Sequence, residues 1–170
     1  MFLNHRLDTR LMFAMGRELA DYFGKDKPDI VLTVEASGIA LALAAAHFLD
    51  DIPVVFAKKS PAATQSADML TAVAHSFTHG NDNALRVDRR YLPAGSRVLV
   101  VDDFLADGEA SRALISIVEQ AGCTLVGVGI AVEKGFQPGG RKLREAGVNL
   151  KSLAIVTSIQ DGRIQLADDD

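Results

Sequence analysis

The chain contains one cysteine and no tryptophan, and it has no long apolar run. The single cysteine, Cys123, excludes a disulfide within the chain and a zinc site built from cysteines. No apolar run approaches the roughly 20 residues that span a bilayer, and residues 1–6 lack the basic-then-apolar layout of a signal peptide. We therefore expect a cytoplasmic protein without a membrane segment.

Basic charge is not in excess either. Lys and Arg number 18 against 22 Asp and Glu, and a net charge of −4 gives no overall attraction to nucleic acid. Apolar residues make up 48% of the chain, which is enough to build a core without disulfides or a metal. Because no internal repeat or linker interrupts the sequence, we expect one domain over residues 1–170.

The hydrophobic pattern alternates between the periods of helices and strands. Apolar residues at spacings of three and four predict an amphipathic helix over residues 7–23, ending at Gly24. Further helices are expected over residues 37–49, 109–120 and 141–146, and strands over residues 30–34, 53–57, 97–101, 125–132 and 150–159. Residues 58–68 are expected to form a long loop and residues 70–88 a hairpin arm. The order predicts an α/β fold, a mainly parallel twisted sheet with helices on both faces.

Polar residues follow the predicted strands, at the sheet edge where α/β proteins bind ligands. These residues are Glu35, Ser37 and Gly38 after the first strand, Lys58 and Lys59 after the second, Asp102 and Asp103 after the third, and Glu133 and Lys134 after the fourth. The two adjacent aspartates are predicted to point to opposite sides of the strand end. They would then be two separate acceptors, suited to vicinal hydroxyls or a metal-bound sugar, unless one merely caps the following turn.

A glycine among small residues opens the helix that follows the aspartates. In the loop Ala106-Asp107-Gly108-Glu109-Ala110, backbone N–H groups can converge on a phosphate, assisted by the helix dipole. The loop fits neither G-x-G-x-x-G nor G-x-x-x-x-G-K-[ST]. Residues 98–111 consist of an apolar strand, Asp-Asp, two apolar residues, small-x-Gly-x-small and the start of a helix. This order resembles the phosphoribosyl-diphosphate signature of the type I phosphoribosyltransferases.

The resemblance extends along nearly the whole chain. Residues 2–5, 35–40, 53–57, 70–72 and 133–139 are similar, in the same order, to segments of the bacterial xanthine phosphoribosyltransferases. It implies the type I phosphoribosyltransferase fold and a purine-salvage enzyme that joins xanthine to 5-phosphoribosyl 1-diphosphate (PRPP). The products would be xanthosine 5-monophosphate and pyrophosphate. It also implies Mg²⁺ carried by the diphosphate, no metal ligands dedicated in the chain, and a homodimer.

The resemblance also implies roles for individual residues. The ribose hydroxyls would be held by Asp102 and Asp103, the 5-phosphate by Ala106, Asp107, Gly108, Glu109 and Ala110, and the pyrophosphate by Ser37 and Gly38 with Lys58 or Lys59. The purine would be contacted by Asn4, by Lys134 at its 6-oxo group and by Phe136 stacking on the ring. The loop over residues 60–68 would close over the site as a lid.

The sequence departs from the family in three places. Asp107 and Glu109 stand where the family usually carries neutral Asn and Gln, and carboxylates repel a phosphate unless they face solvent. The loop after Lys59 lacks the family's extra basic residues, and the family has a further segment before the point that corresponds to Met1, including an apolar base contact.

Two other functions are compatible with the same sequence features. One alternative is a non-catalytic regulatory protein that senses PRPP on the same fold, and another is an enzyme for guanine or hypoxanthine, since all three bases carry the 6-oxo group. A receiver domain is disfavoured because its acidic pair follows the first strand, whereas Asp102 and Asp103 lie in mid-chain.

Overall fold

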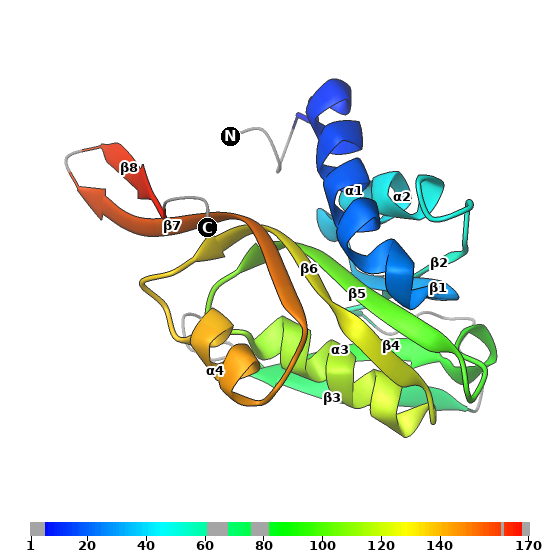
Figure 1. Ribbon diagram of the computed structural model, residues 1–170. Coiled ribbons are helices and arrows are strands. Elements are labelled where there is room, and N and C mark those ends of the chain that lie inside the picture. Colours follow the sequence, from blue (N-terminus) through cyan, green and yellow to red (C-terminus); the bar gives the residue numbers. More distant parts are fainter. Residues whose placement is uncertain (1–5, 61–67, 76–81, 161, 168–170) are drawn as a thin grey trace.

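The computed structural model describes residues 6–60, 68–75, 82–160 and 162–167, and a six-stranded sheet lies at its centre (Figure 1). The strands lie in the order β2-β1-β5-β6-β7-β8, and all neighbours are parallel except β7 and β8. Their bounds are β1 Ile30–Val34, β2 Val54–Ala57, β5 Arg97–Leu105, β6 Thr124–Lys134, β7 Leu150–Gln160 and β8 Arg163–Leu166. This confirms the predicted mainly parallel sheet.

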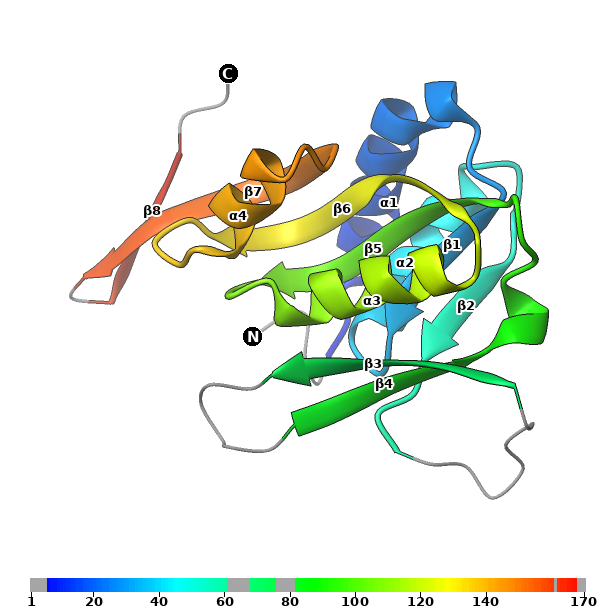
Figure 2. The same ribbon diagram turned by 90° about the horizontal axis from the view of Figure 1, so that it is seen from below.

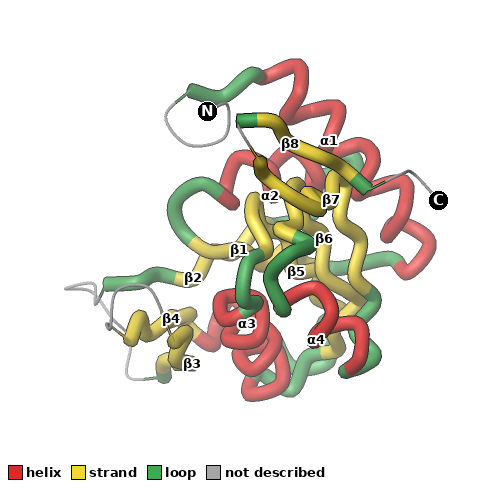
Figure 3. Tube along the Cα trace, turned by 90° about the vertical axis from the view of Figure 1, so that its left-hand side faces the viewer, coloured by secondary structure: helices red, strands yellow, loops and turns green. Residues whose placement is uncertain are grey.

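Helices cover both faces of the sheet, as Figure 3 shows. One face carries α1 (Thr9–Phe23), which continues into the short 3-10 helix η1 (Gly24–Asp26), and α2 (Gly38–His47); the other carries α3 (Glu109–Gln120) and α4 (Gly139–Glu145). Strands β3 (Met69–His75) and β4 (Asp82–Asp88) form an antiparallel hairpin that packs against α3, followed by the 3-10 helix η2 (Arg89–Tyr91) (Figure 2). The predicted hairpin arm is therefore confirmed.

Strand β1 shows why the sheet needs both layers. Its five residues are all buried, because Ile30, Leu32 and Val34 enter the core under α3 while Val31 enters the core under α1 and α2. Strands buried on both faces are typical of parallel sheets. The apolar run that predicted this strand thus reflects two hydrophobic cores, one on each side.

Two predicted strand ends were wrong, and one strand was missed. Strand β5 runs to Leu105, so Asp102 and Asp103 lie within the strand rather than after it, and β6 likewise includes Glu133 and Lys134. Strand β8, which pairs antiparallel with β7, was not predicted, because all four of its residues are exposed and offer no burial pattern to detect. Among the described residues, no helix is long and apolar enough to cross a membrane.

Candidate active site

A cavity of about 270 Å³ lies at the carboxyl ends of β1 and β5. Nine of its lining residues were predicted from the sequence: Ser37, Lys59, Asp102, Asp103, Ala106, Asp107, Gly108, Glu109 and Ala110. The hairpin contributes two more, Ala74 from β3 and Leu85 from β4, which the sequence analysis missed. The hairpin was expected, but no signal in its sequence shows that it packs beside this cavity.

Two helix N-termini border the cavity. Ser37 precedes α2 and Gly108 precedes α3, and neither position caps its helix with a side-chain hydrogen bond; Gly108 has a φ of 82°, which a residue with a side chain rarely adopts. The first N–H groups of a helix have no partner within the helix, and the helix dipole adds positive potential there. Each helix start is therefore suited to an anion such as a phosphate.

The two aspartates between these helix starts have different surroundings. Asp102 is 5% exposed, and burial, followed by the charge of Asp103, raises its pKa to about 8. Asp103 is half-buried, and its backbone N–H donates to Asp102 Oδ1 at 3.0 Å. Without a bound ligand, the Asp102 carboxyl is therefore mostly protonated at neutral pH, which the sequence alone did not indicate.

Gly38, at the start of α2, packs directly on Asp102. A Cβ atom at this position would lie 2.7 Å from Asp102 Oδ1 and would also collide with Thr33 Oγ1. That hydroxyl is buried and has no hydrogen-bond partner among the described residues. A residue larger than glycine would therefore push the helix start away from the aspartate.

Of the two lysines that follow β2, the structure brings only one to the cavity. Lys59 lines the cavity, and its backbone N–H donates to Glu35 Oε1 at 2.6 Å. Lys58 instead pairs with Arg86 through two backbone hydrogen bonds of 2.9 Å and lines a separate hollow of about 430 Å³ beside Tyr91. The geometry therefore favours Lys59 over Lys58 as a partner for an anion.

Comparison with known proteins identifies the family. Residues 7–162 match the phosphoribosyl transferase domain. The chain belongs to the phosphoribosyltransferase family. It is 45% identical to a xanthine phosphoribosyltransferase 1 of Clostridium perfringens (strain 13) over 163 residues, 96% of this chain and 86% of that protein. It is 48% identical to a xanthine phosphoribosyltransferase of Heliobacterium modesticaldum (strain Ice1) over 166 residues, 98% of this chain and 87% of that protein.

Solved structures confirm the type I phosphoribosyltransferase fold. An adenine phosphoribosyltransferase from Thermoanaerobacter pseudethanolicus superposes with a TM-score of 0.71 at 26% identity, covering 84% of this chain and 79% of that chain. Another, from Rhodothermus marinus, superposes with a TM-score of 0.72 at 24% identity, covering 86% of this chain and 78% of that chain. The phosphoribosyltransferase is thus an enzyme of the predicted fold class.

Helix α4 packs behind residues 106–110, the loop that is predicted to bind the 5-phosphate and is called the phosphate loop below. The Gly139 N–H donates to Ala106 O at 3.0 Å, and a Cβ on Gly139 would lie 2.6 Å from Gly108 N. Two N–H groups of Arg144, later in α4, donate to the buried carboxylate of Glu133 on β6 at 2.8 Å each. These contacts fix α4 to the sheet and hold its first residue against the loop.

Glu133 was predicted as a polar residue at the ligand-binding edge of the sheet, but its side chain instead binds Arg144 and so attaches α4 to the sheet. Ser152 on β7 also donates to it, at 2.5 Å. Although burial favours the neutral acid, the hydrogen bonds from Arg144 and Ser152 lower the pKa of Glu133. A carboxylate within an apolar strand was the available signal for such a buried ion pair.

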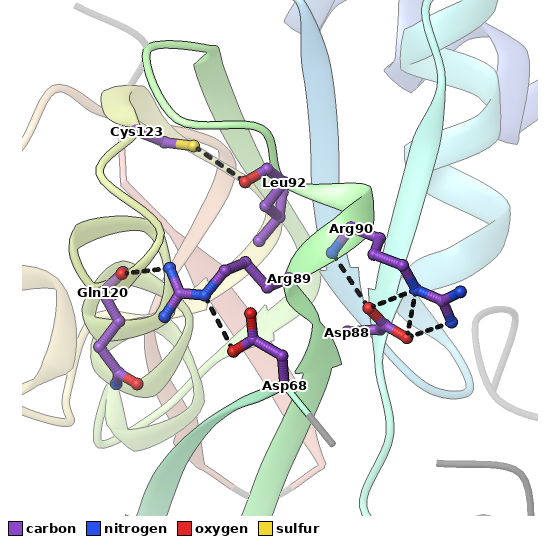
Figure 4. A network of polar contacts seen from close by, with 7 residues as sticks. All are labelled: Asp68, Asp88, Arg89, Arg90, Leu92, Gln120 and Cys123. Carbon is purple, nitrogen blue, oxygen red and sulfur yellow. Dashed lines mark hydrogen bonds and ion pairs between the residues drawn. The ribbon is translucent and has the colours of Figure 1, made fainter. Parts of the chain in front are cut away.

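The hairpin is tied to the far end of α3 by the network in Figure 4. Arg89 donates to Asp68 Oδ1 at 3.0 Å and to the backbone carbonyl of Gln120 at 2.9 Å, while Gln120 donates through Nε2 to Thr71 O at 3.1 Å. Beside it, the Cys123 thiol lies 3.2 Å from Pro93 O and 3.8 Å from Leu92 O, its two possible acceptors. The hairpin that lines the cavity is therefore hydrogen-bonded to the carboxyl-terminal end of α3.

The predicted base-binding residues are not gathered around this cavity. Lys134 ends β6, and Phe136, in the loop that follows, is 52% exposed; neither lines the cavity. Asn4 and most of the predicted lid lie outside the described residues. Their roles therefore stay predictions.

Proposed function

We propose that this phosphoribosyltransferase joins xanthine to PRPP, releasing pyrophosphate and forming xanthosine 5-monophosphate in purine salvage. The observation that carries the proposal is the pair of helix N-termini on either side of Asp102 and Asp103. PRPP has the matching layout, a ribose with a phosphate at one end and a diphosphate at the other. The relatives named as xanthine phosphoribosyltransferases, 45% and 48% identical, support the choice of base.

Each part of the cavity then has a role toward PRPP. The start of α2, at Ser37 and Gly38, takes the diphosphate with help from Lys59, and the loop before α3 takes the 5-phosphate. The two aspartates accept hydrogen bonds from the ribose hydroxyls. All of these residues except Gly38 line one cavity, and Gly38 lies against Asp102.

Magnesium enters with the substrate, bound to the diphosphate. The residues at the cavity fit such an ion, because oxygen ligands suit Mg²⁺ and a cation beside Asp102 favours the ionised form of that buried carboxyl. Among the residues that the structure describes, no group of three His, Cys, Asp or Glu side chains is placed to hold a metal.

The transfer breaks the bond between the anomeric carbon and the diphosphate, whose oxygen keeps the electron pair. A ring nitrogen of the purine forms the new bond to that carbon, and its proton passes to the departing diphosphate or to water. Because the ribosyl centre passes through an oxocarbenium-like state, catalysis rests on orientation, neutralisation of the leaving group and exclusion of water. No histidine is required for these steps.

Discrimination between bases comes from the 2-position of the purine. Lys134 can donate to the 6-oxo group of any of the three bases, whereas Asn4 can donate its amide N–H to the 2-oxo group that only xanthine carries. Asn4 can also flip and accept from the 2-amino group of guanine. A buried polar partner left unpaired costs on the order of 1–3 kcal/mol, so hypoxanthine is expected to be the poorest of the three.

Steady-state kinetics across four purines test the proposal. We expect kcat/KM to fall in the order xanthine, guanine, hypoxanthine, with no use of adenine, and we expect Asn4→Ala to bring xanthine and hypoxanthine within about tenfold of each other. A preference for hypoxanthine, or turnover of adenine, would refute Asn4 and Lys134 as base readers. Binding of PRPP without turnover of any base would favour the regulatory alternative. The homodimer and the cytoplasmic location stay predictions.

A further inference from the structure

The phosphate loop carries two carboxylates, and among the residues that the structure describes only Glu109 has an ion-pair partner. Glu109, the first residue of α3, lines the cavity, and its carboxylate Oε1 accepts from Nη2 of Arg112 one turn later. Asp107 lines the same cavity but makes no ion pair with any described residue. Arg112 thus neutralises one of the two charges that would oppose a phosphate at this helix start.

The guanidinium of Arg112 lies along the loop rather than in open solvent. Its Nη1 is 3.7 Å from the point where a Cβ on Gly108 would lie, and the side chains of Glu109 and Arg112 are 18% and 37% exposed. The backbone N–H of Arg112 also donates to Gly108 O at 2.9 Å, which closes the first turn of the helix. The ion pair therefore lies within one residue of the backbone that would receive the phosphate.

Electrostatics explain what this pair can do. A carboxylate at a helix N-terminus is attracted by the same dipole and N–H groups that a phosphate needs, and like charges a few ångströms apart repel. The first turn of α3 is closed by backbone hydrogen bonds, such as Arg112 N–H to Gly108 O, so the helix does not depend on this one partly exposed ion pair. Its main consequence is that Glu109 presents no free negative charge to a ligand at the loop.

We propose that Arg112 is a positioning residue of the phosphate loop, which holds the Glu109 carboxylate in an ion pair and so allows a phosphate monoester to bind at a helix start that carries an acid. The inference rests on the proposed binding of PRPP at this loop. Phosphate binding at this loop requires Arg112 only as long as residue 109 is acidic. The two residues are therefore expected to be coupled, and Glu109 without Arg112 is the unfavourable combination.

A double-mutant cycle tests this coupling. We compare Glu109→Gln, Arg112→Leu, Arg112→Lys, and Glu109→Gln combined with Arg112→Leu, measuring KM for PRPP and kcat with xanthine, and the binding of ribose 5-phosphate by calorimetry. The coupling is the effect of Arg112→Leu in the wild type minus its effect in the Glu109→Gln background. The control is Arg141→Leu, which breaks an exposed ion pair with Glu145 on α4, 3.3 Å long and far more exposed at 69% and 61%. The melting temperature of each variant separates a loss of binding from a loss of folding.

We expect Arg112→Leu to raise KM for PRPP and to weaken ribose 5-phosphate about tenfold, equivalent to about 1.4 kcal/mol, with kcat changed less. The KM for PRPP and the affinity for ribose 5-phosphate of the double variant should be within about threefold of the wild-type values. Arg112→Lys and Arg141→Leu should leave both quantities near those values. An unchanged KM in Arg112→Leu, or a double variant as poor as Arg112→Leu, would overturn the inference.

The inference and the proposed function can fail separately. If the wild type does not turn over xanthine but binds ribose 5-phosphate with the same dependence on Arg112, the proposed reaction is wrong and the inference stands. If xanthine is turned over and Arg112→Leu behaves as the wild type does, only the inference is wrong. A wild type that binds neither PRPP nor ribose 5-phosphate would overturn both.

Discussion

Replacing Asp102 by Asn is expected to stabilise the protein and to impair it as an enzyme. Burial raises the pKa of Asp102 from 3.8 to about 8, with the charge of Asp103 as the second cause. At a pH between these two pKa values, the Asp102 carboxyl is protonated in the folded chain and ionised in the unfolded chain. Unfolding then releases a proton, so the stability of the wild type falls as pH rises from about 4 to about 8.

The size of the effect follows from the same shift. One proton corresponds to at most about 1.4 kcal/mol per pH unit, which limits the contribution to about 4 kcal/mol between pH 5 and pH 8. An Asn side chain does not ionise, and its Oδ1 can still accept from the Asp103 N–H. We therefore expect Asp102→Asn to be more stable than the wild type at pH 8, by on the order of 2–4 kcal/mol, and close to it at pH 4.

Urea unfolding of the wild type and the variant at several pH values measures this difference directly. Asp103→Asn is the matched control. It removes the neighbouring charge and so lowers the pKa of Asp102, and stability should then stop falling at a lower pH than in the wild type. Charged hydrogen bonds are worth about 1.5–3 kcal/mol each, so Asp102→Asn with Asp103→Asn should lower kcat/KM tenfold or more. Equal pH slopes for the wild type and Asp102→Asn would show that Asp102 is ionised in the folded chain, and unchanged kinetics of the double variant would remove both aspartates from the site.

Two further predictions concern α4, which packs behind the phosphate loop. Gly139→Ala should raise KM for PRPP about tenfold, because its Cβ would lie 2.6 Å from Gly108 N and must displace the loop. The control is Gly24→Ala, whose Cβ meets only Leu49 at 3.6 Å. Equal KM values for the two variants would show that the loop tolerates the shift. Arg144→Met should lower the free energy of unfolding by about 3 kcal/mol, since it leaves a buried carboxylate unpaired. Adding Glu133→Gln should restore part of the loss in urea unfolding, and a double variant no more stable than Arg144→Met would contradict the ion-pair account.

The sequence predicted most elements well because their signals are local. Helix α3 begins and ends where expected, since its apolar period starts after Gly108 and stops before Gly122. Strand β5 was predicted too short for a physical reason: Asp102 interrupts the apolar run, although Leu105 beyond it is again buried. A buried carboxyl within a strand, here one covered by the start of α2, is mistaken in the sequence for the end of that strand.

The choice between two adjacent lysines could not be made from the sequence. Lys58 and Lys59 have the same chemistry, and only the pairing of Lys58 with Arg86 on β4 decides which one lies at the cavity. That pairing joins residues far apart in the chain, across a hairpin whose position relative to the sheet no local pattern specifies. Long-range contacts therefore set the part of the site that sequence reasoning left open.

The charges around the cavity explain how an acidic sheet edge can accept a polyanion. Glu35 accepts the backbone N–H of Lys59, Asp102 is held protonated by burial, and Glu109 is paired with Arg112. Three of the five carboxyls that line the cavity are thus hydrogen-bonded, neutral or ion-paired before any ligand arrives. The sequence counts these groups as formal charges, whereas the potential that a phosphate meets depends on the partners that the fold supplies.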